Sequence, residues 1–508
     1  MSYDFDAVVI GSGAGGAAFA SRFVRAGKSV LVVERGDDPL GADSPFHRHG
    51  AIDELRDERA TLIEKRYYDD RKITVNTEPL RLYMGGVVGG GTSLFGGAMM
   101  RPSDDDFRPG RRYGDRLPHE LWDWPVTYEE LTPYFDEAEA LYHVAADPSD
   151  DYGPLPAPLH RRADELLPQA PINGRLVAAN QAAGLKPFRL PLAIDARRCE
   201  RCDACAGFLC PNGARRSAVA VVGRCRRTRH AHRGRQYRSR ATRNRACRSY
   251  RRRRVAPPRR RHPTNRARPR DGARRRGIGF ARIALRSGIA GPHVGRNYMM
   301  HYSPIAVGIF AHCTGAAETF VKQIGFADFY FGTPELPHKT GLVQSLPTPG
   351  PLMMAKLGLR RWPQGVRNFL RNRMLLLAGI VEDLPNPENR VTVADGERIS
   401  LRHEFSEFDR ARGKALGDEC AAFCDCAGAV FQSSRAFPSR EHVAHQCGTL
   451  RFGRNPRHAA ADRDGRFLGH ENLFVVDGSL LPTSTGVGPS LTITALALRG
   501  ADAALAGI

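Results

Sequence analysis

The sequence predicts an α/β fold, and three features of the chain carry that prediction. Near the start, the apolar run FDAVVI (5–10) is followed by GSGAGG (11–16), an amphipathic stretch and a second apolar run, SVLVVE (29–34). A strand, a glycine turn, a helix and a strand are the elements of a βαβ unit, in the order that it needs. A glycine-dense stretch follows at 84–107, and the last segment (472–505) reads as an apolar strand ending at Asp477, a loop, and a helix from about Pro489. The 508 residues have room for two or three lobes.

The glycine turn predicts a site for the pyrophosphate of a dinucleotide. Gly11 permits the tight turn, Gly13 lets backbone N–H groups approach a pyrophosphate, and Gly16 lets the helix pack against the strand. Glu34 ends the second apolar run, 18 residues after Gly16, where a carboxylate can hold ribose hydroxyls. An acid at this position favours FAD or NAD over NADP.

Further motifs along the chain indicate which dinucleotide it is. They are the glycine loop from Gly89 to Arg101, WPVTYEELTPYF (124–135), VGRNYMMH (294–301), EDLPNPENRVT (382–392), and HQCGTLRFG (445–453) with the C-terminal block. With these motifs the chain resembles the glucose–methanol–choline (GMC) oxidoreductases. The resemblance implies a discontinuous, Rossmann-like FAD-binding domain and a substrate domain with a mixed or antiparallel sheet. We therefore expect an N-terminal region with the βαβ unit at 1–300, mainly the substrate domain at 301–435, and a C-terminal FAD-binding and catalytic segment at 436–508.

The resemblance also implies roles for residues of the C-terminal block and the glycine loop. His445 matches the family's catalytic histidine, a residue type whose pKa lies near working pH and which can accept and return a proton. Residues expected to contact FAD, besides those of the glycine turn, are Gly90, Gly91, Thr92, Asp477, Gly478, Pro489 and Ser490. The backbone N–H groups that begin the last helix are expected to face the flavin N1–C2=O edge.

The sequence departs from the family at one position of the expected site. Relatives carry Asn or His just before the last helix, in an N-P-x-x-T context, whereas GVGPSLT (486–492) places Gly488 there. The expected function is oxidation of the CH–OH group of a small-molecule alcohol, with hydride transfer to flavin N5 and His445 as base. Oxygen, a quinone or a cytochrome would then take up the electrons. Because the donor at 488 is missing, the alternatives are a catalytically impaired member or a non-redox lyase of the same fold.

Four cysteines form a second candidate site. Cys199, Cys202, Cys205 and Cys210 follow a C-x2-C-x2-C-x4-C-P spacing, close to a ferredoxin run but with one more residue before the last cysteine. The chain has no apolar run long enough for a membrane span and no secretory-signal layout at its start, so we expect a cytoplasmic protein with reduced cysteines. The cluster is therefore read as an iron–sulfur or other metal site, with a structural thiol or disulfide knot as the alternative.

One segment carries nearly the whole net charge of +22. Between Arg224 and Arg276 there are 24 arginines, no lysine and a single acid, Asp271. With one valine and no other large aliphatic residue, the segment cannot bury enough apolar surface to offset its conformational entropy, and we expect it to be disordered. It reads as a natural insertion, as a nucleic-acid-binding arm, or as a frame-shifted translation of GC-rich codons. Because the rest of the chain is near neutral, nucleic acid is not an expected partner.

Overall fold

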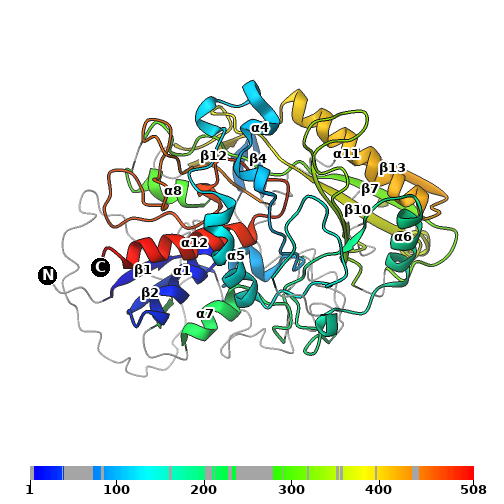
Figure 1. The fold of residues 1–508 in the computed structure, drawn as a ribbon, viewed down its shortest axis with the longest axis horizontal. Helices are drawn as coiled ribbons and strands as arrows, with labels where there is room; N and C mark the ends of the chain where they lie inside the picture. The colour runs from blue at the N-terminus through cyan, green and yellow to red at the C-terminus, as the bar shows by residue number, and fades with distance from the viewer. Residues whose placement is uncertain are drawn as a thin grey trace, which may run out of the picture.

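The computed structural model describes most of the chain outside the arginine-rich segment. The described residues are 5–36, 38, 72–81, 85–159, 163–200, 207, 209–210, 212–226, 231–235, 279–289, 291–316, 320–349, 354, 359–394, 398–436 and 445–508. They form two lobes, one built from both ends of the chain and one from its middle (Figure 1). The helices are α1 (Ala14–Arg25), α4 (Gly110–Tyr113), α5 (Tyr128–Tyr142), α6 (Pro171–Ala182), α7 (Ala218–Arg226), α8 (Gly279–Arg286), α10 (Gln364–Arg371), α11 (Glu407–Cys426) and α12 (Ser490–Leu505).

The first lobe contains the βαβ unit that the sequence predicts. Strand β1 (Ala7–Ile10) runs parallel to β2 (Val30–Glu34), and α1 connects the two. A β-carbon at Gly16 would lie 2.2 Å from the carbonyl oxygen of Gly11, so α1 can approach the strand this closely only because residue 16 is glycine. The α/β prediction is confirmed.

The last helix completes this lobe from the far end of the chain. Helix α12 packs along α1 (Figure 1), and Arg22 forms an ion pair of 2.5 Å with Asp502. Ahead of α12, the carbonyl oxygen of Val476 lies only 1.4 Å from where a β-carbon at Gly15 would stand. Glycine at position 15 is therefore what lets the C-terminal block reach the glycine turn.

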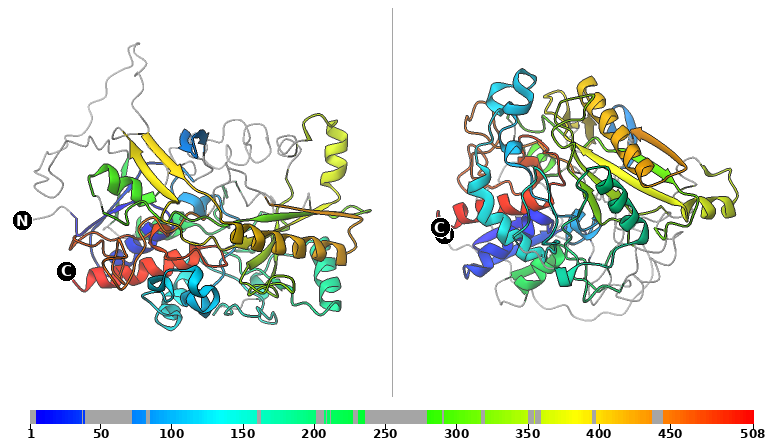
Figure 2. Two further views of the ribbon diagram at one scale, coloured as in Figure 1. Left: turned by 90° about the horizontal axis from the view of Figure 1, so that it is seen from above. Right: turned by 45° about the vertical axis from the view of Figure 1, so that its right-hand side comes forward.

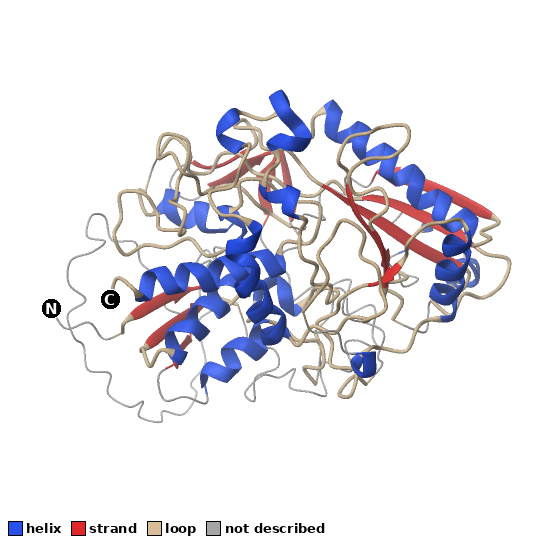
Figure 3. Ribbon diagram, in the orientation of Figure 1, coloured by secondary structure: helices blue, strands red, loops and turns tan. Residues whose placement is uncertain are grey.

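The second lobe is built on an antiparallel sheet. Its six strands follow the order β13-β7-β10-β9-β8-β5, and α11 lies along one face of the sheet (Figures 2 and 3). The middle strand β10 is buried along its whole length. The strands are β5 (Phe188–Arg189), β7 (Pro304–Ile309), β8 (Ile324–Phe326), β9 (Gly341–Leu346), β10 (Met374–Val381) and β13 (Phe431–Ala436).

A third, mixed sheet joins distant parts of the chain. Strands β3 (Lys72–Val75) and β4 (Glu78–Arg81) form a hairpin, which pairs in parallel with β12 (Arg398–Arg402) and through it with β11 (Arg390–Ala394). The boundary expected at residue 300 therefore does not separate the sheets. Segments before it contribute β5 to the six-stranded sheet, and segments after it pair with β3.

Two local expectations differ from the structure. The apolar residues before Asp477 form no regular strand, because their backbone bonds a neighbouring loop: Val475 N–H donates to Gly465, and Phe467 N–H donates to Leu473. In the arginine-rich segment, residues 224–226 form the end of α7, and β6 (Ala231–Arg235) pairs in parallel with β2, so these eight residues depart from the expected disorder. Residues 227–230 and 236–276 of the segment lie outside the described part.

Candidate functional site

Open space lies in front of the glycine turn. A β-carbon at Gly11 or at Gly13 would meet no atom within 4 Å, and the same holds for Gly91 in the glycine loop. Gly13 caps α1 without a side-chain hydrogen bond, and the first turn of the helix carries no acid. The N–H groups at this helix start can therefore donate hydrogen bonds to a phosphate, whose negative charge the helix dipole also favours. These residues fit the pyrophosphate of a dinucleotide.

A hydrogen-bonded chain fixes the glycine turn against the glycine loop. The Glu34 carboxylate accepts from the N–H of Ser12 (2.8 Å), from the Ser12 hydroxyl (2.7 Å) and from the N–H of Gly36 (2.6 Å). The N–H of Gly89 donates to the Ser12 hydroxyl at 2.9 Å. Because a carboxylate offers about four acceptor positions, Glu34 keeps capacity for a ribose hydroxyl.

Two residues of the glycine loop that are predicted to contact FAD, Gly90 and Thr92, have different surroundings. Gly90 lies against Gly13, whose Cα is 3.2 Å from the position of a β-carbon at 90. The Thr92 hydroxyl donates to the carbonyl of Gly89 (2.7 Å) and accepts from the N–H of Ala218 (2.9 Å), the first residue of α7. Thr92 therefore holds the loop to α7.

The predicted residues of the C-terminal block converge on one point. A β-carbon built at Gly488 would lie 3.7 Å from Nε2 and Cε1 of the His445 ring, and no other atom is nearer. Pro489 caps α12 and Ser490 is its first residue. Gly478 packs on the next residue of the histidine segment: a β-carbon there would lie 2.6 Å from the carbonyl oxygen of Gln446. The Asp477 carboxylate accepts from the N–H of Ser479 at 3.0 Å and so fixes the turn before α12.

His301 is the direct partner of His445. Nδ1 of His301 lies 2.9 Å from Nδ1 of His445, and Nε2 of His301 lies 2.8 Å from the carbonyl oxygen of Thr485. The two rings meet edge to face, 86° apart. Since a carbonyl oxygen only accepts, Nε2 of His301 must carry the hydrogen of that bond.

The charge states of the two rings then assign the tautomer of His445. Burial lowers the pKa of His301 to about 4, so the ring is neutral and its Nδ1 holds a lone pair. Burial, with His301 and Lys322 nearby, also lowers the pKa of His445 well below its usual value. The bond between the rings therefore requires Nδ1 of His445 to donate, which leaves its Nε2 unprotonated beside Gly488.

A buried ion cluster holds the loop that carries Thr485. The ammonium of Lys339 pairs with the carboxylates of Asp106 and Glu382, and all three side chains are buried. Burial alone would lower the pKa of Lys339, but the two carboxylates raise it above its usual value. Glu382 accepts from the N–H of Thr485 at 2.9 Å, and Asp106 accepts from the N–H of Gly486 at 3.3 Å.

Two residues next to the ion cluster and the histidine pair have a strained backbone conformation. Thr485 has a φ of 61° and His445 a φ of 62°, in the left-handed region that costs non-glycine residues about 1–3 kcal/mol. His301 forms hydrogen bonds with both of these residues. We infer that these surrounding contacts hold the two backbones in the left-handed conformation. Strain of this kind concentrates at functional sites.

The sequence pointed to no role for His301, Lys339, Asp106 or Glu382. Three of them lie in or beside motifs that carried the family resemblance, such as VGRNYMMH and EDLPNPENRVT. A histidine at the end of one motif and an acid at the start of another were the available signals. Neither shows which residue of a distant segment is its partner.

The cysteine cluster is only partly described. Of the four cysteines, Cys199 and Cys210 are described, and Cys210 is a free thiol that lies 3.3 Å from the side-chain oxygen of Asn212. Cys202 and Cys205 lie outside the described residues. Within the described chain, no group of three or more His, Cys, Asp or Glu residues is placed to hold a metal. The metal site stays a prediction.

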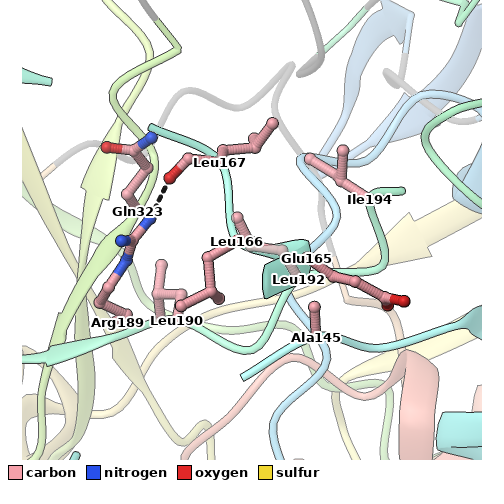
Figure 4. A pocket seen from close by; sticks show the side chains of 9 residues that line it. All are labelled: Ala145, Glu165, Leu166, Leu167, Arg189, Leu190, Leu192, Ile194 and Gln323. Carbon is pink, nitrogen blue, oxygen red and sulfur yellow. Dashed lines mark hydrogen bonds between the residues drawn. The ribbon is translucent and has the colours of Figure 1, made fainter. Parts of the chain in front are cut away.

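One small cavity lies apart from the histidine pair. Its volume is about 10 Å³, it is lined mainly by aliphatic side chains such as Leu190 and Leu192, and Arg189 closes one side by donating to the carbonyl of Leu167 (Figure 4). This is about the room that one water needs, so the cavity cannot take a flavin or an alcohol.

In the described part of the chain, no helix is both long and apolar enough to cross a bilayer.

Comparisons with known proteins agree with this geometry. A family model described as GMC oxidoreductase matches residues 385–497, and one described as NAD(P)-binding Rossmann-like domain matches residues 9–66. The chain is 29% identical to 6'''-hydroxyparomomycin C oxidase of Streptomyces lividus, over 97% of this chain and 90% of that protein. It is 26% identical to 2-methyl-1,2-propanediol dehydrogenase of Mycolicibacterium austroafricanum, over 98% of this chain and 94% of that protein. The fold resembles that of pyridoxine 4-oxidase from Mesorbium loti, with a TM-score of 0.60, 17% identity, and coverage of 98% of this chain and 99% of that one.

Proposed function

The chain belongs to the GMC oxidoreductase family of FAD-dependent enzymes that act on CH–OH groups, and we propose that His445 is the base of this reaction. The observation that carries the proposal is the hydrogen-bond chain from Thr485 through His301 to His445. This chain leaves Nε2 of His445 unprotonated, and that nitrogen faces Gly488 at the start of α12. A base must present a lone pair where the substrate binds, and here the neighbouring residues enforce it.

In the proposed reaction, Nε2 of His445 accepts the proton of the substrate hydroxyl. Bound FAD supplies the hydride acceptor, its N5 atom, for the hydrogen on the hydroxyl-bearing carbon. Because burial keeps both histidines neutral at neutral pH, His445 begins the reaction with its lone pair free. As it gains the proton, its Nδ1–H keeps donating to His301, so the ring stays oriented. The proton leaves from Nε2 after product release.

We propose that the residues of the first lobe hold FAD. The helix start at Gly13 and Ala14 would bind the pyrophosphate, and Glu34 would accept from the ribose. The glycine loop at Gly90 and Gly91, together with the N–H groups that begin α12, would line the flavin. The open space at Gly11, Gly13 and Gly91 supports this placement.

The substrate of the proposed reaction is a small-molecule alcohol. The similar proteins are named as oxidases or dehydrogenases of compounds that carry hydroxyl groups, which supports this class for the present chain. The lobe built on the antiparallel sheet is the proposed substrate domain, because its strand β9 bonds the loop beside the histidine pair. The N–H of Leu342 in β9 donates to the carbonyl of Gly486, the residue after Thr485. Oxygen, a quinone or a cytochrome is the proposed electron acceptor.

The proposal is tested by mixing the FAD-loaded protein with alcohols under anaerobic conditions. An oxidised substrate bleaches the flavin absorbance, and His445→Ala should slow this bleaching by about 10²–10⁴ without changing the FAD content. Unchanged bleaching in the variant would refute the role of His445. Product formation without bleaching would favour the alternative that the absence of a side chain at Gly488 suggests, a non-redox lyase.

A further inference from the structure

Helix α10 presents large apolar side chains to solvent. None of its eight residues is buried, Val366 is 40% exposed and Phe369 is 53% exposed. Trp362, in the turn just before the helix, is 46% exposed. Single exposed apolar residues are common on protein surfaces, whereas several close together mark an interaction surface.

The apolar and the basic residues of α10 lie on opposite sides of the helix. Val366, Phe369 and Leu370 are three and four residues apart, which places them on one face. Arg367 and Arg371 are four residues apart and share the other face. Tryptophan, phenylalanine or leucine on one side and basic residues on the other are typical of a helix that lies in the interface of a lipid bilayer.

The turn and the helix also carry a concentrated positive charge. The sequence has no Asp or Glu from residue 336 to residue 381. Five arginines fall within residues 359–373, here called the α10 patch: Arg360, Arg361, Arg367, Arg371 and Arg373. This charge is complementary to anionic lipid headgroups, which attract each basic residue near the membrane surface. A second copy of the chain would present the same charge and be repelled.

The side chains of the α10 patch have a fixed support. Nη1 of Arg367 donates to the carbonyl oxygen of Trp362 at 2.8 Å, which ties the turn to the helix. Cζ of Arg373 lies 3.8 Å from the centre of the Phe369 ring. The carbonyl of Arg373 accepts from the N–H of Phe310 at 2.8 Å, which joins the segment to the end of β7. Little further ordering is needed for these side chains to bind a surface.

Strand β13 adds exposed apolar residues at the same end of the sheet. Val430 is 68% exposed and Phe431, the first residue of β13, is 57% exposed. The N–H of Val430 donates to the carbonyl of Ile309 at 2.8 Å, and the next residue, Phe310, donates to Arg373. The α10 patch and the start of β13 therefore flank the end of β7.

The α10 patch lies away from the histidine pair. Strand β10 begins at Met374, after α10, and ends at Val381, next to Glu382 of the ion cluster. Its eight residues span roughly 25 Å. Figure 2 shows α10 (yellow-green) at the outer end of the lobe. Changes in the patch therefore leave the proposed oxidation site intact.

We propose that the α10 patch binds the surface of a membrane that contains anionic lipids. Trp362, Val366 and Phe369 enter the headgroup layer, where their apolar surface leaves water. The arginines form charge-assisted hydrogen bonds with lipid phosphate and carboxylate groups. The helix lies on the membrane without crossing it. This contact goes beyond the proposed oxidation and does not depend on it.

Co-sedimentation with vesicles tests the proposal on the FAD-loaded full chain. One set of vesicles is phosphatidylcholine alone, and the other is phosphatidylcholine and phosphatidylserine in a ratio of about 3:1. The protein should bind the second set at least about tenfold more tightly. Because the arginine-rich segment would also be attracted to these vesicles, a second measurement must report on the patch itself.

Tryptophan fluorescence supplies that measurement. Residues 224–276 contain no tryptophan, whereas the α10 patch contains Trp362. Lipids with brominated acyl chains quench a tryptophan that enters the bilayer. The wild type should be quenched, and Trp362→Phe, which keeps an aromatic ring at this position and leaves Trp122 and Trp124, should sediment similarly but lose the quenching.

Paired substitutions separate the apolar from the basic contribution. Trp362→Ser combined with Phe369→Ser should weaken vesicle binding at least about tenfold, and Leu159→Ser, which removes an exposed leucine elsewhere, should not. Arg360→Gln combined with Arg361→Gln should weaken binding about tenfold, on the phosphatidylserine vesicles only. Equal FAD content in all of these variants checks that they fold.

Three results would overturn the proposal. Absence of quenching in the wild type would do so, and so would equal sedimentation of the wild type and both double variants, since binding would then come from another part of the chain. The third is a wild-type dimer that the Trp362→Ser, Phe369→Ser variant converts to a monomer, because a second copy would then cover the patch. Oxidation of a soluble alcohol needs no vesicles, so none of these results bears on the proposed function.

Discussion

The hydrogen bond between the two histidines makes a quantitative prediction. In His301→Leu the Nδ1–H of His445 loses its acceptor, and leaving a buried donor unpaired costs about 1–3 kcal/mol. That cost falls on the reactive tautomer alone, so the equilibrium shifts by about fivefold to 150-fold towards the tautomer with hydrogen on Nε2. The anaerobic rate of flavin bleaching should fall by a similar factor.

His301→Asn is the matched control for this experiment. The side-chain oxygen of asparagine can occupy nearly the position of Nδ1 of His301, so it can accept from His445 while the ring is lost in both variants. We expect His301→Asn to keep most of the rate. The ¹⁵N spectrum of labelled histidine, which distinguishes protonated from unprotonated ring nitrogens, should show His445 with hydrogen on Nδ1 in the wild type and in His301→Asn only. Equal rates and equal spectra in His301→Leu and the wild type would refute the reasoning.

Three more predictions follow from the same contacts. Gly488→Asn should raise turnover by at least about tenfold, because its β-carbon fits 3.7 Å from the base and its amide supplies the missing donor; an unchanged kcat with a good substrate would contradict this. Gly13→Ala should fold but bind FAD weakly, whereas Gly15→Ala should fail to fold because its β-carbon overlaps a carbonyl; a purified Gly13→Ala protein with the FAD content of the wild type would argue against the site. Lys339→Met should lower the free energy of unfolding by about 3–5 kcal/mol, measured by denaturant titration, because it leaves two carboxylates buried and unpaired.

The sequence determined the features that depend on local chain geometry. Glycines at 11, 13 and 16 between two apolar runs define a βαβ unit by themselves, because a tight turn and a close helix–strand contact each require a missing side chain. The capping box of α5, in which Thr127 and Glu130 bond each other's backbone, is equally local. The family motifs extended this reading to His445 and to the departure at Gly488.

Only the tertiary structure decided how His445 is held. His301 is 144 residues away from it in the chain, and the carbonyl of Thr485 that fixes the tautomer is supported by a third segment at Glu382. A hydrogen bond or an ion pair between distant segments depends on how whole sheets pack, and residue type and spacing carry no record of that packing. The sequence therefore determined that a base and an FAD-binding turn exist, and the fold decided which nitrogen of the base is free to react.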